Sequence, residues 1–143
     1  MTHTETALGL FAQQMHCSQA VLAAFAEELG ITKEEAFRLG GAFGGGMRKG
    51  EVCGACTGAL MAIGLRYGQT VIGDTEAKQR CDQKTVAFLN TFQAENGSCL
   101  CRDLLGYNLS SDMQRDAARA AGVFGKVCPQ IICSAVEILE TLL

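Results

Sequence analysis

Among the residue types of this sequence, cysteine is the one whose chemistry and spacing suggest a functional site. Cys53 and Cys56 stand three residues apart in the segment Gly50–Ala59, so a helix beginning here would carry both thiols on one face. A thiol in the first turn of a helix ionises more easily, because the helix dipole stabilises the thiolate. Thiolates bind metal ions and attack disulfides. The spacing therefore indicates a redox or metal site, without specifying a substrate.

The chain carries eight cysteines, and the other six stand at intervals along it. Cys81 falls on the apolar stripe of a predicted helix, so we expect it in the core, where free cysteine acts as a small hydrophobic residue. The same explanation suits two or three of the eight. Thiol clusters in a chain without an export signal more often bind metal or do redox chemistry than form a disulfide framework. We therefore expect at least four thiols to share one site.

Five short motifs follow one another along the chain. They are Cys17-Ser18-Gln19-Ala20-Val21-Leu22, Phe43-Gly44-Gly45-Gly46-Met47, Cys53-Gly54-Ala55-x-x-Gly58-Ala59-Leu60-Met61, Cys101-Arg102-Asp103-Leu104-Leu105-Gly106 and Cys128-Pro129. In this order they resemble the C-GCAxxG-C-C family, whose members are described as redox-active. The resemblance covers nearly the whole chain, roughly from Cys17 to the C-terminal helix. It implies an iron–sulfur cluster or similar metal centre and four functional thiols, which fall on Cys17, Cys53, Cys101 and Cys128.

Four cysteines depart from this four-thiol pattern. Cys56, Cys99 and Cys133 are secondary candidates for the same site, and Cys81 is the predicted core residue. Cys99 stands two residues before Cys101, where it could be a second ligand, a resolving thiol or a residue without a role. His16, beside Cys17, is more readily explained as a surface or hydrogen-bonded residue than as a metal ligand.

Three functions remain open. The first is a small redox protein that binds an iron–sulfur cluster through Cys17, Cys53, Cys101 and Cys128, and passes electrons or metal to a partner protein. The second is metal-free thiol–disulfide exchange, with Cys53–Cys56 or Cys99–Cys101 as the exchanging pair. The third is a structural zinc site in a protein that acts through interactions. No catalytic residues are assigned, and whether the chain is an enzyme stays undecided.

Other chemistries find little support. The glycine-rich loop Gly40–Gly50 has neither the Gly-Lys-Ser/Thr ending of a P-loop nor a G-x-G-x-x-G triplet after a strand. No histidine follows Cys56, which excludes covalent haem attachment there. Ser–His–carboxylate, HExxH and paired-carboxylate patterns are not evident, and the chain has only two histidines. A thioredoxin-like fold is disfavoured, because a glycine loop and not a strand precedes Cys53.

The composition suits one domain, taken as residues 1–143. Hydrophobic residues make up 48% of the chain, which is enough to fill a core. The net charge of −3 and the lack of a basic patch argue against nucleic-acid binding. The longest apolar run is too short to span a bilayer, and no signal peptide is visible, so a cytoplasmic protein is expected.

Apolar periodicity of three to four residues predicts an all-α, bundle-like domain of about six to seven helices. A single proline and the absence of strand-like alternation agree with this prediction. The segment His16-Cys17-Ser18 marks a break within the first helical stretch. The predicted stretches are 4–29, 32 to about 42, 52–67, 76–95, 102–105, 111 to about 121 and 128 to the C-terminal end.

The predicted last helix begins at Cys128-Pro129, because proline favours the first position of a helix. Residues 122–127 would then form a connector, and the Cys128 thiol would lie near a positive helix end, like that of Cys53. The glycines before Cys53 suit backbone with positive φ and close approach of other groups. The leucine-rich end of the last helix offers a contact for a homodimer.

Overall fold

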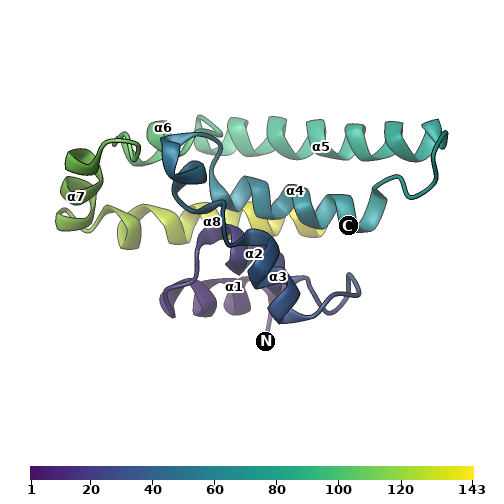
Figure 1. Ribbon diagram of the computed structural model, residues 1–143, viewed down its shortest axis with the longest axis horizontal. Helices are drawn as coiled ribbons and strands as arrows, with labels where there is room; N and C mark the ends of the chain where they lie inside the picture. The colour runs from purple at the N-terminus through teal and green to yellow at the C-terminus, as the bar shows by residue number, and fades with distance from the viewer.

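The computed structural model describes residues 1–143 and confirms the all-α prediction (Figure 1). It has eight α-helices and one π-helical turn, η1, and its only β-type pairing is an isolated antiparallel bridge between Val52 and Leu100. The elements are α1 (His3–Ala12), α2 (Cys17–Ala24), α3 (Lys33–Gly40), η1 (Gly46–Gly50), α4 (Gly54–Tyr67), α5 (Thr75–Asn96), α6 (Cys101–Leu105), α7 (Asp112–Ala120) and α8 (Val123–Leu142).

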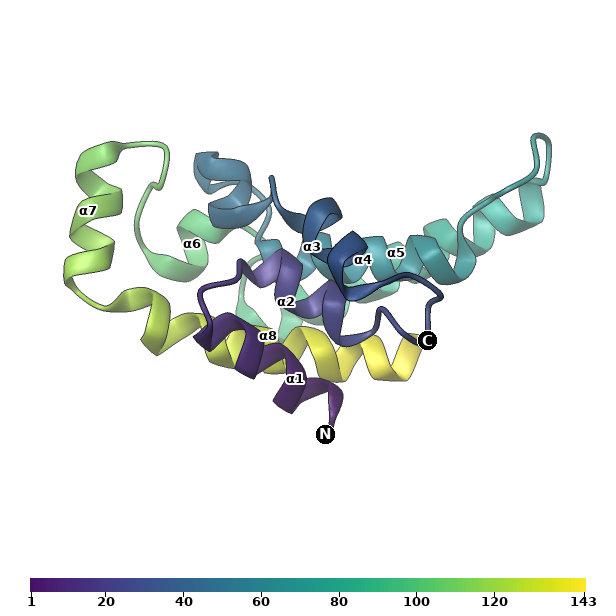
Figure 2. The ribbon, with the colours of Figure 1, turned by 60° about the horizontal axis from the view of Figure 1, so that its bottom comes forward.

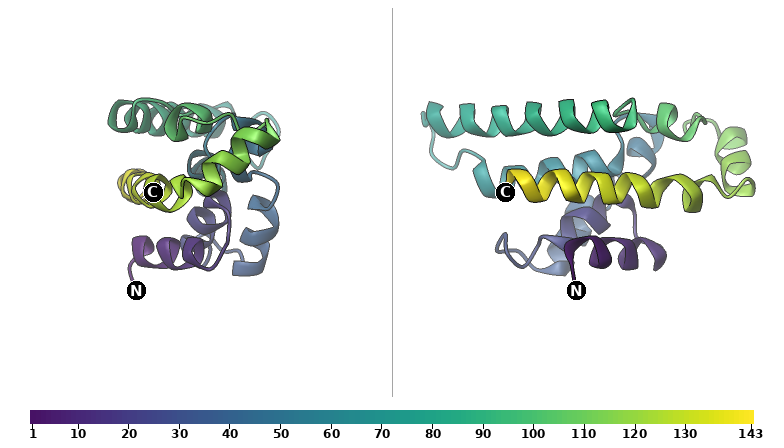
Figure 3. Two further views of the ribbon diagram at one scale, coloured as in Figure 1. Left: turned by 90° about the vertical axis from the view of Figure 1, so that its left-hand side faces the viewer. Right: turned by 180° about the vertical axis from the view of Figure 1, so that it is seen from behind.

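The helices are stacked in three tiers, seen edge-on in Figure 3 (left). The middle tier contains α4 and α8, which pack against each other; both also contact α5 above them. The lower tier contains α1, α2 and α3, with α2 against α4 and α1 against α8. The short helix α7 stands at one end, bent by 86° from the axis of α8.

Buried side chains form two separate cores. The main core lies between α2, α4, α5 and α8 and contains the fully buried rings of Phe25, Phe88 and Phe92. The minor core gathers α6, α7 and the start of α8 around Leu105 and Ala118. The two cores meet where α6 and α2 contact α8, and this boundary positions the cysteines described below.

Helix starts follow the capping signals of the sequence. Thr32 caps α3 by accepting a hydrogen bond from the N–H of Glu35, and Ser111 caps α7 by accepting one from Gln114. The first helical stretch is divided as the sequence suggested, with Gln14 at φ +74° in the turn between α1 and α2. Helix α2 ends at Ala24, so the prediction that helix continues to residue 29 was wrong.

The start of the last helix was predicted wrongly. Helix α8 begins at Val123, and its N-cap is Gly122, which has a φ of +68°. The residues expected to form a connector are therefore mostly part of the first turns of this helix. Pro129 therefore lies inside α8 and cannot donate to the carbonyl of Gly125, one turn earlier. Gly125 is exposed, so water can satisfy that carbonyl. Cys128 consequently lies in the second turn of α8, not at a helix N-terminus.

No single helix is long and apolar enough to cross a membrane. Only α7 and α8 taken together have the required length and composition, and they are bent at the break between them.

Candidate metal or redox site

Three of the four thiols implied by the family stand at helix starts. Cys53 is the N-cap of α4, and Cys17 and Cys101 are the first residues of α2 and α6. Cys128 comes from the second turn of α8. Figure 2 shows α2 and α6 on the same side of the first half of α8, and both helices contact α8. We call Cys17, Cys53, Cys101 and Cys128 the four-thiol group.

Glycines of the Cys53 motif allow α2 to cross close to α4. A Cβ atom at Gly58 would lie 2.6 Å from the carbonyl oxygen of Ser18, and one at Gly54 would lie 3.3 Å from the Cβ of Cys17. The buried Ser18 hydroxyl donates a 2.7 Å hydrogen bond to the carbonyl of Gly40, which fixes the first turn of α2. The motif thus places Cys17 beside the start of α4.

A backbone bridge connects Cys53 with Cys101. The N–H of Cys53 donates to the carbonyl of Cys99 at 2.8 Å, and the N–H of Cys101 donates to the carbonyl of Glu51 at 2.7 Å. These two hydrogen bonds flank the antiparallel pair Val52–Leu100. The start of α4 is therefore held against the start of α6, although the long helix α5 separates them in sequence. The bridge is too short to leave a strand pattern, so sequence reasoning missed it.

The glycine-rich loop packs against the site in a left-handed turn. Four consecutive residues, Gly45 to Arg48, have positive φ, and two of them, Met47 (φ 59°) and Arg48 (φ 62°), are not glycine. A Cβ at Gly46 would lie 2.9 Å from the Cβ of Cys101 and 2.5 Å from the N of Glu51. Only glycine can therefore occupy position 46 while the loop contacts Cys101.

The four-thiol group lies at the boundary of the two cores. Cys53 belongs to the main core and Cys101 and Cys128 to the minor core, each with at most 7% of its surface exposed. Cys17 is partly exposed and packs against both cores. Such burial removes water from the sulfur atoms, which strengthens every electrostatic interaction between them.

The protonation of these thiols is coupled. A hydrogen bond to the Cys128 side chain raises the pKa of Cys17 well above its ordinary value, and burial and charge on Cys128, Cys53 and Cys101 add to this effect. Burial raises the pKa of Cys101 to about 12, with contributions from charge on Cys53 and Cys128. Charge on Cys53 and on Cys128 therefore raises the pKa of both Cys17 and Cys101.

Cys53 differs from the rest in its tendency to ionise. A hydrogen bond from the Cys56 thiol lowers the pKa of Cys53 in spite of burial, and the backbone N–H groups of Ala55 and Cys56 add to the effect. The same hydrogen bond, followed by burial, raises the pKa of Cys56. Cys53 is therefore the thiol of the site whose environment favours ionisation, as expected at a helix start.

The cysteines outside the four-thiol group lie in different surroundings. Cys99 donates its Sγ hydrogen to the carbonyl of Leu89 at 3.6 Å, and burial raises its pKa. Cys133 lies further along α8, where burial and the charge of Glu137 raise its pKa. Cys81 lies in α5, partly buried against the main core, as expected for a core residue.

The donor set suits a soft metal centre, but the side chains are not arranged as a formed metal site. All eight cysteines are free thiols, and thiolates are the ligands that iron–sulfur clusters and zinc prefer. As the side chains stand, no three Cys, His, Asp or Glu residues are grouped to hold a metal ion. The four-thiol group fits such a centre in ligand type, number and burial.

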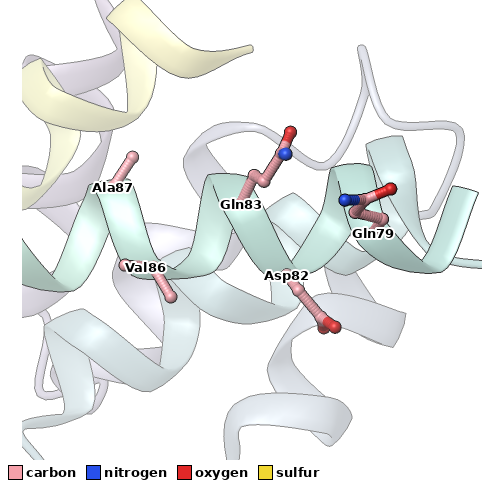
Figure 4. Close-up of a pocket in the computed structure, with 5 residues that line it drawn as sticks. All are labelled: Gln79, Asp82, Gln83, Val86 and Ala87. Carbon is pink, nitrogen blue, oxygen red and sulfur yellow. The ribbon is translucent and has the colours of Figure 1, made fainter. Parts of the chain in front are cut away.

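A surface hollow elsewhere offers no alternative site. It measures about 400 Å³ and is lined by one helix only, α5, without any cysteine, histidine or basic residue (Figure 4). The lining residues are Gln79, Asp82, Gln83, Val86 and Ala87. They lie mostly in the N-terminal half of α5, whereas α6 lies near the other end of this helix (Figure 1). The hollow is therefore separate from the thiols.

Comparison with known proteins agrees with the cysteine pattern. The chain matches no curated protein and no solved structure. Residues 15–142 match the family model described as "Putative redox-active protein (C_GCAxxG_C_C)", which is nearly the whole chain and includes all eight cysteines. The chain therefore belongs to the C_GCAxxG_C_C family of redox-active proteins.

Proposed function

We propose that this protein is a redox protein whose four-thiol group binds an iron–sulfur cluster, and that it transfers electrons or metal to a partner protein. The observation that carries the proposal is the approach of four cysteine-bearing segments to one another. Backbone hydrogen bonds join the start of α4 to the start of α6, Cys17 lies close to Gly54, and α2 and α6 both contact α8. Four cysteine thiolates are the usual ligand set of such clusters.

Electrostatics supports a cation at this point. The pKa values of Cys17 and Cys101 are raised, in part by negative charge on neighbouring thiols. Without a cation to offset that charge, these two thiols resist ionisation. A bound metal reverses this preference, since a coordinating thiol is deprotonated outright. A bound iron–sulfur cluster would supply one-electron chemistry, at a potential set by burial and by hydrogen bonds to sulfur.

The residues of the chain have distinct parts in this proposal. Cys53 is the first ligand available, because its pKa is already lowered by Cys56 and by backbone N–H groups. The bridge between Val52 and Leu100 keeps Cys53 and Cys101 together before any metal arrives. The two cores exclude water from the sulfurs, and Cys17 packs against both cores.

Thiol–disulfide exchange at Cys53 and Cys56 is the second candidate. The lowered pKa of Cys53 and the Cys56 thiol that donates to it favour this reading. The Cys53 thiolate would attack a disulfide RSSR to give a mixed disulfide and RS⁻, and the Cys56 thiolate would then release the second RS⁻. A zinc ion bound by the four-thiol group, with a structural role, is the remaining alternative.

The test is purification without oxygen, followed by a visible spectrum and measurement of iron, sulfide and zinc. We expect visible absorption with iron and sulfide in equal amounts. Zinc without sulfide would favour the structural site. A colourless protein that stays free of metal after attempted reconstitution, yet reduces a disulfide substrate through Cys53, would overturn the proposal in favour of exchange.

A further inference from the structure

The glycine-rich loop forms part of the protein surface next to the four-thiol group. Its buried Gly46 packs so closely on α6 that a Cβ atom at this position would lie 2.9 Å from the Cβ of Cys101. The three residues that follow are exposed, and we call them the loop tip: Met47, Arg48 and Lys49. A molecule bound at the loop tip would therefore be separated from Cys101 by the thickness of this loop only.

The loop tip is basic, although the chain as a whole is acidic. Arg48 and Lys49 form no ion pair within the protein, so both positive charges face solvent. The nearest carboxylate along the chain, that of Glu51, is paired with Arg102 at 3.2 Å. Residues 43–51 and α6 together carry three basic and two acidic side chains, the second acid being Asp103, whereas the net charge of the chain is −3. The surface beside Cys101 is thus positive against an acidic background.

The residue types of the loop tip do not serve the stability of the fold. Met47 and Arg48 hold φ at 59° and 62°, a conformation that glycine would adopt without strain. Strain of this kind gathers at functional sites, where another role offsets its cost. Methionine and arginine are also among the residue types enriched in protein–protein interfaces. An exposed, strained Met-Arg pair is therefore explained by contact with another protein.

We propose that the loop tip is the docking surface for the redox partner, and that this partner presents an acidic face around a one-electron centre of its own. The inference rests on the proposed function, because it names the kind of protein that exchanges electrons with the four-thiol group. Opposite charges speed the encounter of two proteins and orient them before they touch. The exposed Met47 side chain would supply the apolar centre of a small, transient contact.

The reaction at this surface would be a transfer of one electron. The reduced centre of the partner loses the electron and the cluster of the four-thiol group gains it, without any bond made or broken. Docking at the loop tip would bring the two centres together on the side of Cys101, where the loop packs on α6.

The test uses the full chain, with an acidic flavodoxin as the probe. Amide NMR spectra of the ¹⁵N-labelled, metal-free protein are recorded while oxidised flavodoxin is added at low salt. We expect shifts concentrated at residues 46–50, and we expect them to disappear in about 0.5 M NaCl, because salt screens exposed charges. The double variant Arg48→Glu with Lys49→Glu should bind flavodoxin at least about tenfold more weakly than the parent.

The matched control is the double variant Lys78→Glu with Arg80→Glu. Both residues are exposed and lie in the N-terminal half of α5, whereas α6, which the loop contacts, lies near the other end of this helix (Figure 1). The control has the same net charge as the loop-tip variant, so only the position of the changed charges differs. It should bind flavodoxin within about twofold of the parent.

Three results would overturn the inference: no shifts on addition of flavodoxin, shifts away from the loop, or equal weakening in the two double variants. The metal-free titration is decided without a cluster, so its failure is distinct from a failure to find iron and sulfide, which contradicts the proposed function. In iron-loaded protein, reduced flavodoxin should reduce the loop-tip variant about tenfold more slowly than the control. Equal rates would also overturn the docking surface.

Discussion

Five thiols of the folded chain, among them Cys17, Cys56 and Cys101, hold their protons more tightly than free cysteine does. The pKa values of Cys17, Cys56 and Cys101 are raised, through hydrogen bonds, burial and charge on neighbouring sulfurs. The unfolded chain loses these protons near the ordinary thiol pKa of 9.0, whereas folded Cys101 keeps its proton up to about 12. The stability of the metal-free protein should therefore be complete below pH 9 and fall as the pH rises from 9 towards 12.

The slope of that decline can be measured by urea unfolding at several pH values above 8, under reducing conditions. Each thiol with a raised pKa lowers the free energy of unfolding by at most about 1.4 kcal/mol per pH unit. The variant Cys101→Ala should show a shallower decline than the parent. Cys81→Ala, in α5 and outside the four-thiol group, is the control and should decline as the parent does. Equal slopes in Cys101→Ala and the parent would contradict this account.

Backbone strain is concentrated at two residues of the glycine-rich loop. Met47 and Arg48 occupy the left-handed region, which costs a residue with a side chain about 1–2 kcal/mol. Arg48 is exposed and forms no ion pair, so Arg48→Gly should raise the free energy of unfolding by about 1 kcal/mol, after the entropy of glycine in the unfolded chain is deducted. Thermal and urea unfolding would measure the gain.

Lys49→Gly is the matched control, because Lys49 is the next residue, is also exposed and has no positive φ. It should leave the protein unchanged or slightly less stable. If both variants changed stability alike, the left-handed turn would not be a source of strain. Positive φ could be predicted at the glycines of this loop, but not at Met47 and Arg48, since nothing in their residue types favours it.

At the scale of elements, the contact between α2 and α4 depends on Gly58. The variant Gly58→Ala would place a Cβ 2.6 Å from the backbone oxygen of Ser18. Because backbone atoms cannot move aside cheaply, we expect a loss of about 1–3 kcal/mol in unfolding free energy. Gly64→Ala, in the same helix, meets nothing within 4 Å and should stabilise by up to about 1 kcal/mol. A loss of similar size in both variants would contradict the close crossing.

The sequence predicted those elements whose ends carry a chemical signal. Thr32, Asp74 and Ser111 each accept a hydrogen bond from a backbone N–H in the first turn of the helix that follows. Pro129 misled the prediction for α8, since proline suits the first position of a helix but is tolerated further in when the freed carbonyl faces solvent. Local residue type alone does not distinguish these two situations.

At the scale of the whole molecule, the four-thiol group lies where the main and minor cores meet. Which thiols lie there depends on contacts between elements far apart in the chain, such as those of α2 with α4 and of α6 with α8. Cysteine spacing predicted that several thiols share a site, and the family resemblance implied that these are Cys17, Cys53, Cys101 and Cys128. Neither indicated the backbone hydrogen bond from Cys53 to Cys99, because it depends on how the segment before α6 docks on α4.

The central claim is that Cys17, Cys53, Cys101 and Cys128 bind one metal centre together. The most direct test is the metal content of single serine variants purified without oxygen. We predict that each of these four variants loses most of its iron and sulfide, while Cys81→Ser and Cys133→Ser keep both at the level of the parent. Circular dichroism would show that each variant is folded. Iron retained in folded variants of the four-thiol group, or lost equally in the two controls, would contradict the account.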